Sequence, residues 1–196
     1  MRHLIGGLVL YSLGMFPAEA ALKEGDKAPD FTAKASLAGK EFNFSLQDAL
    51  KKGPVVVYFY PSAYTNGCNI EAHTFAEDKE KFEAVGTSII GVSQDSIERL
   101  NDYSADPEFC AGKFPVASDV DGSIAAAYDL KTLDLPPGFK DSRGDIVEHA
   151  ATERTTFVIR PDSRIAVTLS SADDNIGPID HVDQSLEMAR ELAAMK

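Results

Sequence analysis

The chain has 196 residues, of which 44% are hydrophobic and 26% are charged. This balance is typical of a folded globular protein and excludes a mainly disordered chain. The length suits one well-cored domain better than two. The formal net charge of −12 argues against nucleic acid or an anionic membrane surface as a partner, because a basic patch would lie within a strongly acidic field. Small neutral substrates remain compatible with this charge.

The first twenty residues have the pattern of a secretory signal peptide. Arg2 and His3 form a short polar start, Leu4–Phe16 is mostly apolar, and Ala18–Ala20 has the small residues of a cleavage site. A buried first helix is the alternative, but glycines interrupt the run and Pro17 ends it. The run is also too short to span a membrane. We therefore expect residues 1–20 to be removed and residues 21–196 to form one exported domain, in the periplasm of a Gram-negative bacterium.

The mature chain reads as strands alternating with helices. The period-2 and buried apolar segments predict strands at Phe31–Leu37, Lys40–Phe44, Val55–Tyr60, Ser88–Val92, Thr155–Arg160 and Arg164–Leu169. Helical periodicity predicts helices at Leu46–Lys51, Cys68–Val85, Ser96–Ser104 and Ser123–Tyr128, with a final helix that Asp180 caps. This order predicts an α/β fold in which helices flank a central mixed β-sheet that carries an N-terminal β-hairpin.

Two stretches of the sequence carry more specific signals. Asp95 and Glu98 have the spacing of a capping box, which predicts that Asp95 caps the third helix. The segment Leu130–Ala151 is irregular and rich in turn signals, and within it Ile146–Val147 favours a minor strand. The acidic residues in general are interpreted as solvated faces of the molecule.

Cys68 lies where a buried strand ends and the next helix begins. Unpaired N–H groups and the helix dipole at such a position favour the thiolate. A fall in its pKa from about 8.5 to about 6 would raise the thiolate fraction at neutral pH to roughly nine tenths. Thr65, three residues earlier, can direct its hydroxyl toward the sulfur. Arg154, at the head of a later strand, can reach the same pocket and hold a thiolate by charge.

The chain has two cysteines, Cys68 and Cys110. Two cysteines in an exported protein often form a structural disulfide. Such a bridge could stabilise the fold by roughly 4 kcal/mol in the chain-entropy model. On the residues alone, a reactive thiolate and a structural bridge both remain open.

A longer pattern resembles a known family. Pro61-x-x-x-Thr65-x-x-Cys68 is similar to the active-site motif of peroxiredoxins, and the flanking residues resemble the peroxiredoxin Q, or bacterioferritin comigratory protein, branch. Further matching segments occur in the order expected for that family, at Gly25–Phe31, Gly91–Ser93, Phe114–Pro115, Ser118–Asp119, Ala127–Tyr128 and Arg154–Ile159. The resemblance covers nearly the whole mature chain.

The resemblance implies a thioredoxin-like fold and a thiol-dependent peroxidase of the atypical two-cysteine kind, reducing hydrogen peroxide and organic hydroperoxides. Cys68 would be the peroxidatic nucleophile and Pro61 would shield its sulfur. Thr65, the backbone N–H of Cys68 and Arg154 would hold the peroxide, and Glu71 would orient the arginine. Fixed donors of this kind can stabilise the charge that develops on the leaving oxygen. Cys68 would become a sulfenic acid, which a second thiol converts to a disulfide.

The resemblance also suggests the second thiol. Many members carry it five residues after the first, where this chain has His73, and others carry it before the Phe-Pro segment, where this chain has Cys110. Cys110 is therefore assigned as the resolving residue, and both cysteine segments are expected to unfold locally on oxidation. His73 either tunes the sulfur or is an ordinary surface histidine. His149 and His181 are interpreted as surface residues.

Two other functions remain as alternatives. One is an exported thioredoxin-like binding or scaffold module with a structural Cys68–Cys110 disulfide, and the other is a disulfide oxidoreductase, which the lack of an adjacent cysteine pair disfavours. No cofactor or metal site is expected, because the cysteines have no CxxC spacing and no histidines stand at i, i+4. Expected partners are the peroxide and a dithiol reductant, either a thioredoxin-like protein or a small thiol. The mature chain is expected to bind neither nucleic acid nor membrane and to be a monomer or weak dimer.

Overall fold

The computed structural model describes residues 21–195, so the expected signal peptide lies outside the described residues. The strands are β1 (Thr32–Leu37), β2 (Lys40–Ser45), β3 (Val55–Phe59), β4 (Ser88–Ser93), β5 (Val116–Ser118), β6 (Thr132–Leu133), β7 (Ala151–Thr152), β8 (Thr155–Ile159) and β9 (Ile165–Ser170). The helices are α1 (Leu46–Leu50), α2 (Asn66–Ala84), α3 (Ile97–Ala105), α4 (Ser123–Ala127) and α5 (Pro178–Ala194). Within this part of the chain, no helix is both long and apolar enough to cross a membrane.

Seven strands form one mixed sheet in the order β2-β1-β5-β4-β3-β8-β9. β3, β4 and β5 run parallel, whereas β8 pairs antiparallel with β3 and β1 pairs antiparallel with both β5 and β2. Every residue of β3 is buried, as expected for a strand covered on both faces. The sheet confirms the predicted mixed α/β fold and its N-terminal β1–β2 hairpin.

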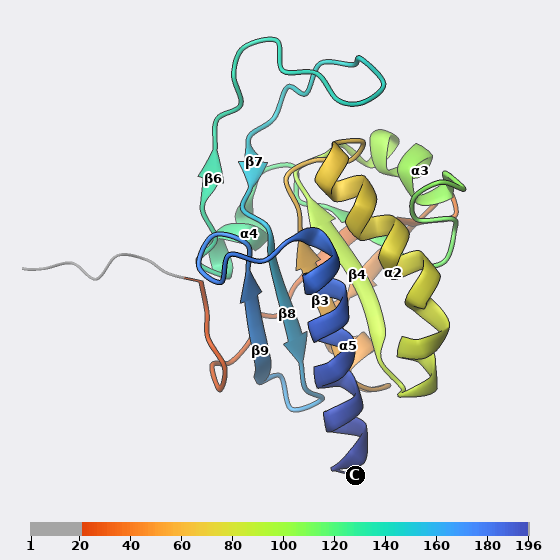
Figure 1. The fold of residues 1–196 in the computed structure, drawn as a ribbon, viewed down its shortest axis with the longest axis vertical. Coiled ribbons are helices and arrows are strands. Elements are labelled where there is room, and N and C mark those ends of the chain that lie inside the picture. The colour runs from red at the N-terminus through yellow and green to blue at the C-terminus, as the bar shows by residue number, and fades with distance from the viewer. Residues whose placement is uncertain (1–20, 196) are drawn as a thin grey trace, which may run out of the picture.

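Side chains of β3 alternate between two apolar layers. Val56 and Tyr58 pack with α2, α3 and α5, and Val57 and Phe59 pack with α1 and α4 on the opposite face. Figure 1 shows α2 and α5 side by side over one face of the sheet. A methyl group at Gly91 would lie 2.6 Å from the Tyr58 ring. The glycine therefore lets this large aromatic lie across the neighbouring strand.

Both predicted acidic caps were wrong. Ser96 caps α3 by accepting from the Arg99 N–H, and Gly177 is the first residue before α5. Asp180 instead lies inside α5, where its carboxylate accepts the Gly177 N–H at 2.8 Å. Asp95 does not cap α3 because its buried carboxylate accepts instead from Ser62, Ala63 and Ser93.

The segment 130–151 contains β6 and ends at the first residue of β7. These two strands pair antiparallel and form a two-stranded sheet separate from the main one. Figure 1 shows it projecting from the body of the protein at the end where α2 begins. The predicted strand at Ile146–Val147 is absent among the described residues, where Ile146 makes one isolated bridge to Lys140. The loop is nevertheless anchored, since the Ser142 N–H donates to the Tyr64 carbonyl at 2.8 Å.

Candidate active site

Cys68 is the third residue of α2, which confirms its predicted place in the first turn of a helix after a buried strand. Its side chain is buried among the large aromatics of the α2 layer. Thr65 stands directly before the helix, and its hydroxyl donates to the Ser62 carbonyl at 2.9 Å. Pro61 opens the loop and is partly exposed. The loop between β3 and α2 therefore brings all three motif residues to one edge of the sheet.

Sheet register brings Arg154 to the same edge. β8 pairs antiparallel with β3 so that Thr155 faces Phe59, and Arg154 comes just before that pair. One terminal nitrogen of Arg154 donates to the Cys68 sulfur at 3.3 Å, and the other forms an ion pair with the buried carboxylate of Glu71. The arginine therefore links the sulfur to Glu71, as the resemblance implied.

Burial dominates the electrostatics of this site. It raises the pKa of the Cys68 thiol above its ordinary value, although the Arg154 charge acts to lower that pKa. The expected lowering of the Cys68 pKa is therefore wrong for this buried thiol. Burial also raises the pKa of Glu71 to about 7, against the pull of Arg154.

Cys110 lies in the turns after α3 and is a buried free thiol, as is Cys68. Burial, and after it the Asp106 charge, raises the pKa of Cys110 well above its ordinary value. Two side chains tie this segment to α2. The ring of His73 is 2.9 Å from the Glu108 carbonyl, and Lys113 donates to the Ala76 carbonyl at 3.0 Å.

His73 is exposed, as the surface interpretation proposed, but the same interpretation was wrong for the other two histidines. His181 is buried between the hydroxyls of Thr156 and Ser171, each 2.9 Å from a ring nitrogen. His149 is partly buried and lies 2.9 Å from an Asp95 oxygen. The partners of both histidines come from other parts of the chain. The periodicity of a helix or strand does not reveal such contacts.

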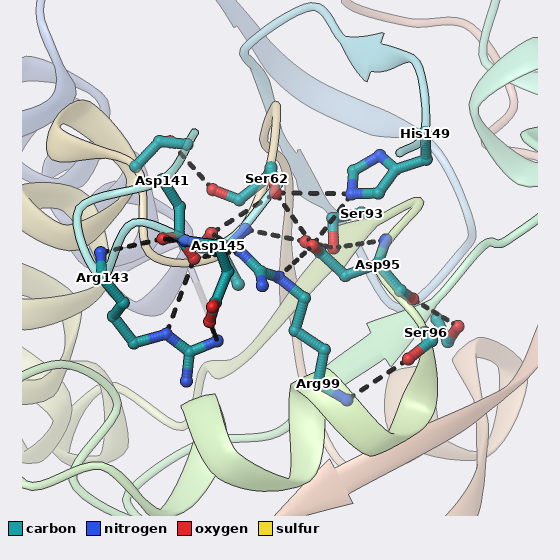
Figure 2. Close-up of polar contacts among 12 residues, drawn as sticks. Ser62, Ser93, Asp95, Ser96, Arg99, Asp141, Arg143, Asp145 and His149 are labelled. Carbon is teal, nitrogen blue, oxygen red and sulfur yellow. Dashed lines mark hydrogen bonds and ion pairs between the residues drawn. The ribbon is translucent and has the colours of Figure 1, made fainter. Parts of the chain in front are cut away.

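A buried polar cluster next to the active-site loop was missed altogether. It comprises Ser62, Ser93, Asp95, Arg99, Asp141 and His149 (Figure 2). The interpretation of acidic residues as solvated was wrong for Asp95 and Asp141, which are buried. One feature of the sequence could have indicated this cluster. Asp95 follows β4, and because β4 runs parallel to β3, the ends of both strands lie at the same edge of the sheet as the active-site loop. Within the described residues, no cluster of potential metal ligands is present.

The comparisons with known proteins agree with this geometry. The AhpC/TSA family matches residues 24–168 of the chain. Peroxiredoxin Bcp of Xanthomonas campestris is 30% identical over 111 residues, which are 57% of this chain and 62% of the relative.

Two solved structures show the same fold. The crystal structure of peroxidoxin BcpB from Mycobacterium tuberculosis has a TM-score of 0.71 and 29% identity, covering 87% of this chain and 98% of that one. Peroxiredoxin Q of Xanthomonas campestris has a TM-score of 0.63 and 27% identity, covering 82% and 90%. The chain belongs to the AhpC/TSA family as a peroxiredoxin of the Q type, and it is accordingly a thiol peroxidase.

Proposed function

We propose that the enzyme reduces hydrogen peroxide and organic hydroperoxides through Cys68. The Cys68 thiolate attacks one peroxide oxygen, the O–O bond breaks, and the departing oxygen takes a proton and leaves as water or an alcohol. The sulfur is oxidised to a sulfenic acid. The observation that carries this proposal is the Arg154 nitrogen 3.3 Å from the sulfur in the first turn of α2. A fixed cationic donor there can stabilise the negative charge on the oxygens in the transition state.

We further propose that Cys110 resolves the sulfenic acid. Its sulfur attacks the Cys68 sulfur, an S–S bond forms, the S–O bond breaks, and water leaves. Both thiols are buried, and the Tyr103 hydroxyl on α3 holds the Cys68 carbonyl at 3.0 Å. The two segments must therefore loosen before the disulfide forms. A dithiol, either a thioredoxin-like protein or a small thiol, then reduces the disulfide and restores both cysteines.

Stopped-flow oxidation of the reduced protein by hydrogen peroxide, followed by mass spectrometry, tests both steps. Cys68→Ser should abolish peroxide consumption, whereas Cys110→Ser should allow one turnover and then accumulate sulfenic or over-oxidised Cys68. The wild type should yield a Cys68–Cys110 link. A wild-type protein that reacts no faster than a free thiol would overturn the assignment of Cys68. A link that resists dithiols would instead indicate the structural bridge of a scaffold protein.

We also propose that the protein is exported to the periplasm. The support is the signal-like pattern of residues 1–20. Mass spectrometry of the protein from a periplasmic extract should then find Ala21 at the amino terminus. An intact Met1 on protein confined to the cytoplasm would contradict the proposal.

A further inference from the structure

Asp95 is buried beneath the loop that joins β3 to α2. One carboxylate oxygen accepts the Ser62 hydroxyl at 2.8 Å, and the other accepts the Ala63 N–H at 2.7 Å and the Ser93 hydroxyl at 2.7 Å. Figure 2 shows the Ser62 and Ser93 side chains pointing toward the Asp95 carboxylate. Asp95 thus fixes two consecutive loop residues to the end of β4.

The loop residues that Asp95 holds lead directly into the first turn of α2, which carries the peroxidatic sulfur. The Thr65 hydroxyl is itself oriented by the Ser62 carbonyl at 2.9 Å. A hydroxyl has one hydrogen, and Thr65 donates it to that carbonyl, so this bond ties the residue directly before α2 to Ser62. Movement of Ser62 would therefore displace Thr65 and, with it, the start of the helix that carries Cys68.

Two cationic side chains complete the environment of Asp95. The Arg99 Nε lies 2.9 Å from Asp95, while its terminal nitrogen donates to Asp141 at 2.6 Å and to the Ala63 carbonyl at 2.9 Å. His149 contributes its Nε2 at 2.9 Å from Asp95. Four hydrogen-bonding groups and the Arg99 cation surround one carboxyl group, which favours the ionised form.

Both ring nitrogens of His149 face acceptors. Nε2 faces the Asp95 carboxylate, and Nδ1 lies 2.9 Å from the Ala150 carbonyl. Because neither acceptor can donate, this geometry requires a hydrogen on each nitrogen, which is the imidazolium form. The Ser62 hydroxyl is also 3.3 Å from Nε2. With no nitrogen free to accept a proton, however, the Ser62, His149 and Asp95 group is not a nucleophilic triad.

His149 and Asp141 both belong to the segment 130–151, which contacts the active-site loop directly. Asp141 is buried and accepts the N–H groups of Arg143 and Asp145 as well as Arg99. The Arg143 guanidinium stacks on the Tyr64 ring at 3.4 Å from its centroid. The segment is therefore fixed to the loop by charge, hydrogen bonds and stacking.

We propose that Asp95 is a positioning residue for the peroxidatic loop, and that the His149 imidazolium supplied by the segment 130–151 strengthens this hold. Oxidation of Cys68 then depends on the protonation of His149. This inference rests on the proposed function in one respect, namely that Cys68 is the peroxidatic residue.

The charges around His149 determine the direction of the effect. Burial lowers the pKa of His149, but the hydrogen bond and charge of Asp95 and the Ala150 carbonyl outweigh it and raise that pKa, with Arg99 opposing. Asp141 partly neutralises Arg99 through their ion pair. As pH rises through the pKa of His149, the ring loses one N–H and its charge. The attraction between His149 and Asp95 then weakens, and Asp95 holds the loop less firmly.

The test compares second-order rate constants for oxidation of the reduced full-length protein by hydrogen peroxide, from about pH 5 to about pH 9. His149→Gln keeps a donor for Asp95 but cannot become charged. The ratio of the wild-type constant to that of His149→Gln cancels the titration of Cys68 itself. We expect this ratio to exceed one at low pH and to fall in a single-proton transition toward one. Glu148→Gln is the control, because Glu148 is the exposed neighbour of His149. The ratio of the wild-type constant to that of Glu148→Gln should not change with pH.

Asp95→Asn should lower the rate constant about tenfold or more at every pH, because a neutral amide has one acceptor oxygen for these four partners and no charge for Arg99. If that variant does not fold, Ser62→Ala replaces it and should lower the constant in the same direction. A flat ratio for His149→Gln, or wild-type rates in the Asp95 or Ser62 variant, would overturn the inference. A wild-type Cys68 that does not react with peroxide would instead overturn the proposed function.

Discussion

Gly67 is the residue that lets Arg154 approach the sulfur. A Cβ at Gly67 would lie 3.0 Å from the same Arg154 nitrogen that donates to Cys68. Gly67→Ala should therefore displace the guanidinium and lower the rate of Cys68 oxidation by about ten- to a hundredfold, since small misplacements of catalytic groups are costly.

Stopped-flow oxidation by hydrogen peroxide measures the effect of Gly67→Ala, and Asn66→Ala is the matched control because Asn66 is exposed in the same turn. Alanine favours a helix more than glycine does, so the stability of α2 should not decrease. Equal rates for the two variants would show that Arg154 tolerates the methyl group.

At the scale of elements, the contacts between α2 and the Cys110 segment should oppose disulfide formation. Lys113 donates across this boundary to the Ala76 carbonyl. Lys113→Ala removes one such hydrogen bond, worth about 1 kcal/mol, and should accelerate formation of the Cys68–Cys110 link about fivefold once Cys68 is oxidised.

Acid quench, alkylation and mass spectrometry at successive times measure that step for Lys113→Ala. The control is Lys81→Ala, because Lys81 pairs with Asp78 within α2 and does not join the two segments. Slower linkage in Lys113→Ala than in this control would mean that the contact assists the resolving step.

For the whole molecule, His181 should make stability depend on pH. Burial, and after it the Arg154 charge, lowers the pKa of His181 to about 4, whereas an unfolded histidine titrates near about 6.5. A depressed pKa means that the stabilisation is complete above the unfolded value and is lost as pH falls toward 4. The loss in the free energy of unfolding should reach about 3 kcal/mol.

Urea unfolding of the wild type and His181→Gln at about pH 7 and about pH 4 measures this contribution. The wild type should lose more stability on acidification than the variant, by about 3 kcal/mol. His73→Gln, at an exposed site, should behave as the wild type does. An equal loss in wild type and His181→Gln would exclude His181 as the source.

Local patterns in the sequence predicted the elements around Cys68, because a buried strand and a helix leave their own periodicities. The place of Arg154 at the head of a strand predicted its approach to the sulfur, and the resemblance added Glu71, which forms an ion pair with Arg154 in the structure. The cap at Asp95 was mistaken because spacing alone cannot show whether a carboxylate is buried, and the cap at Asp180 was mistaken because α5 begins at Pro178, with Gly177 before it. The pKa of Cys68 was mistaken for a related reason: the helix start is a local feature, but the desolvation that raises the pKa comes from the packed layer around it.

The sequence by itself thus determined the fold class, the family and the position of Cys68 at the start of a helix, all of which depend on residues close together in the chain or on a motif. Only the tertiary structure decided which distant groups share one environment. Parallel pairing of β3 and β4 placed Asp95 beneath the active-site loop, and the return of the segment 130–151 brought His149 to the same carboxylate. Burial and charge at such contacts act through space, so the order of residues along the chain does not reveal them.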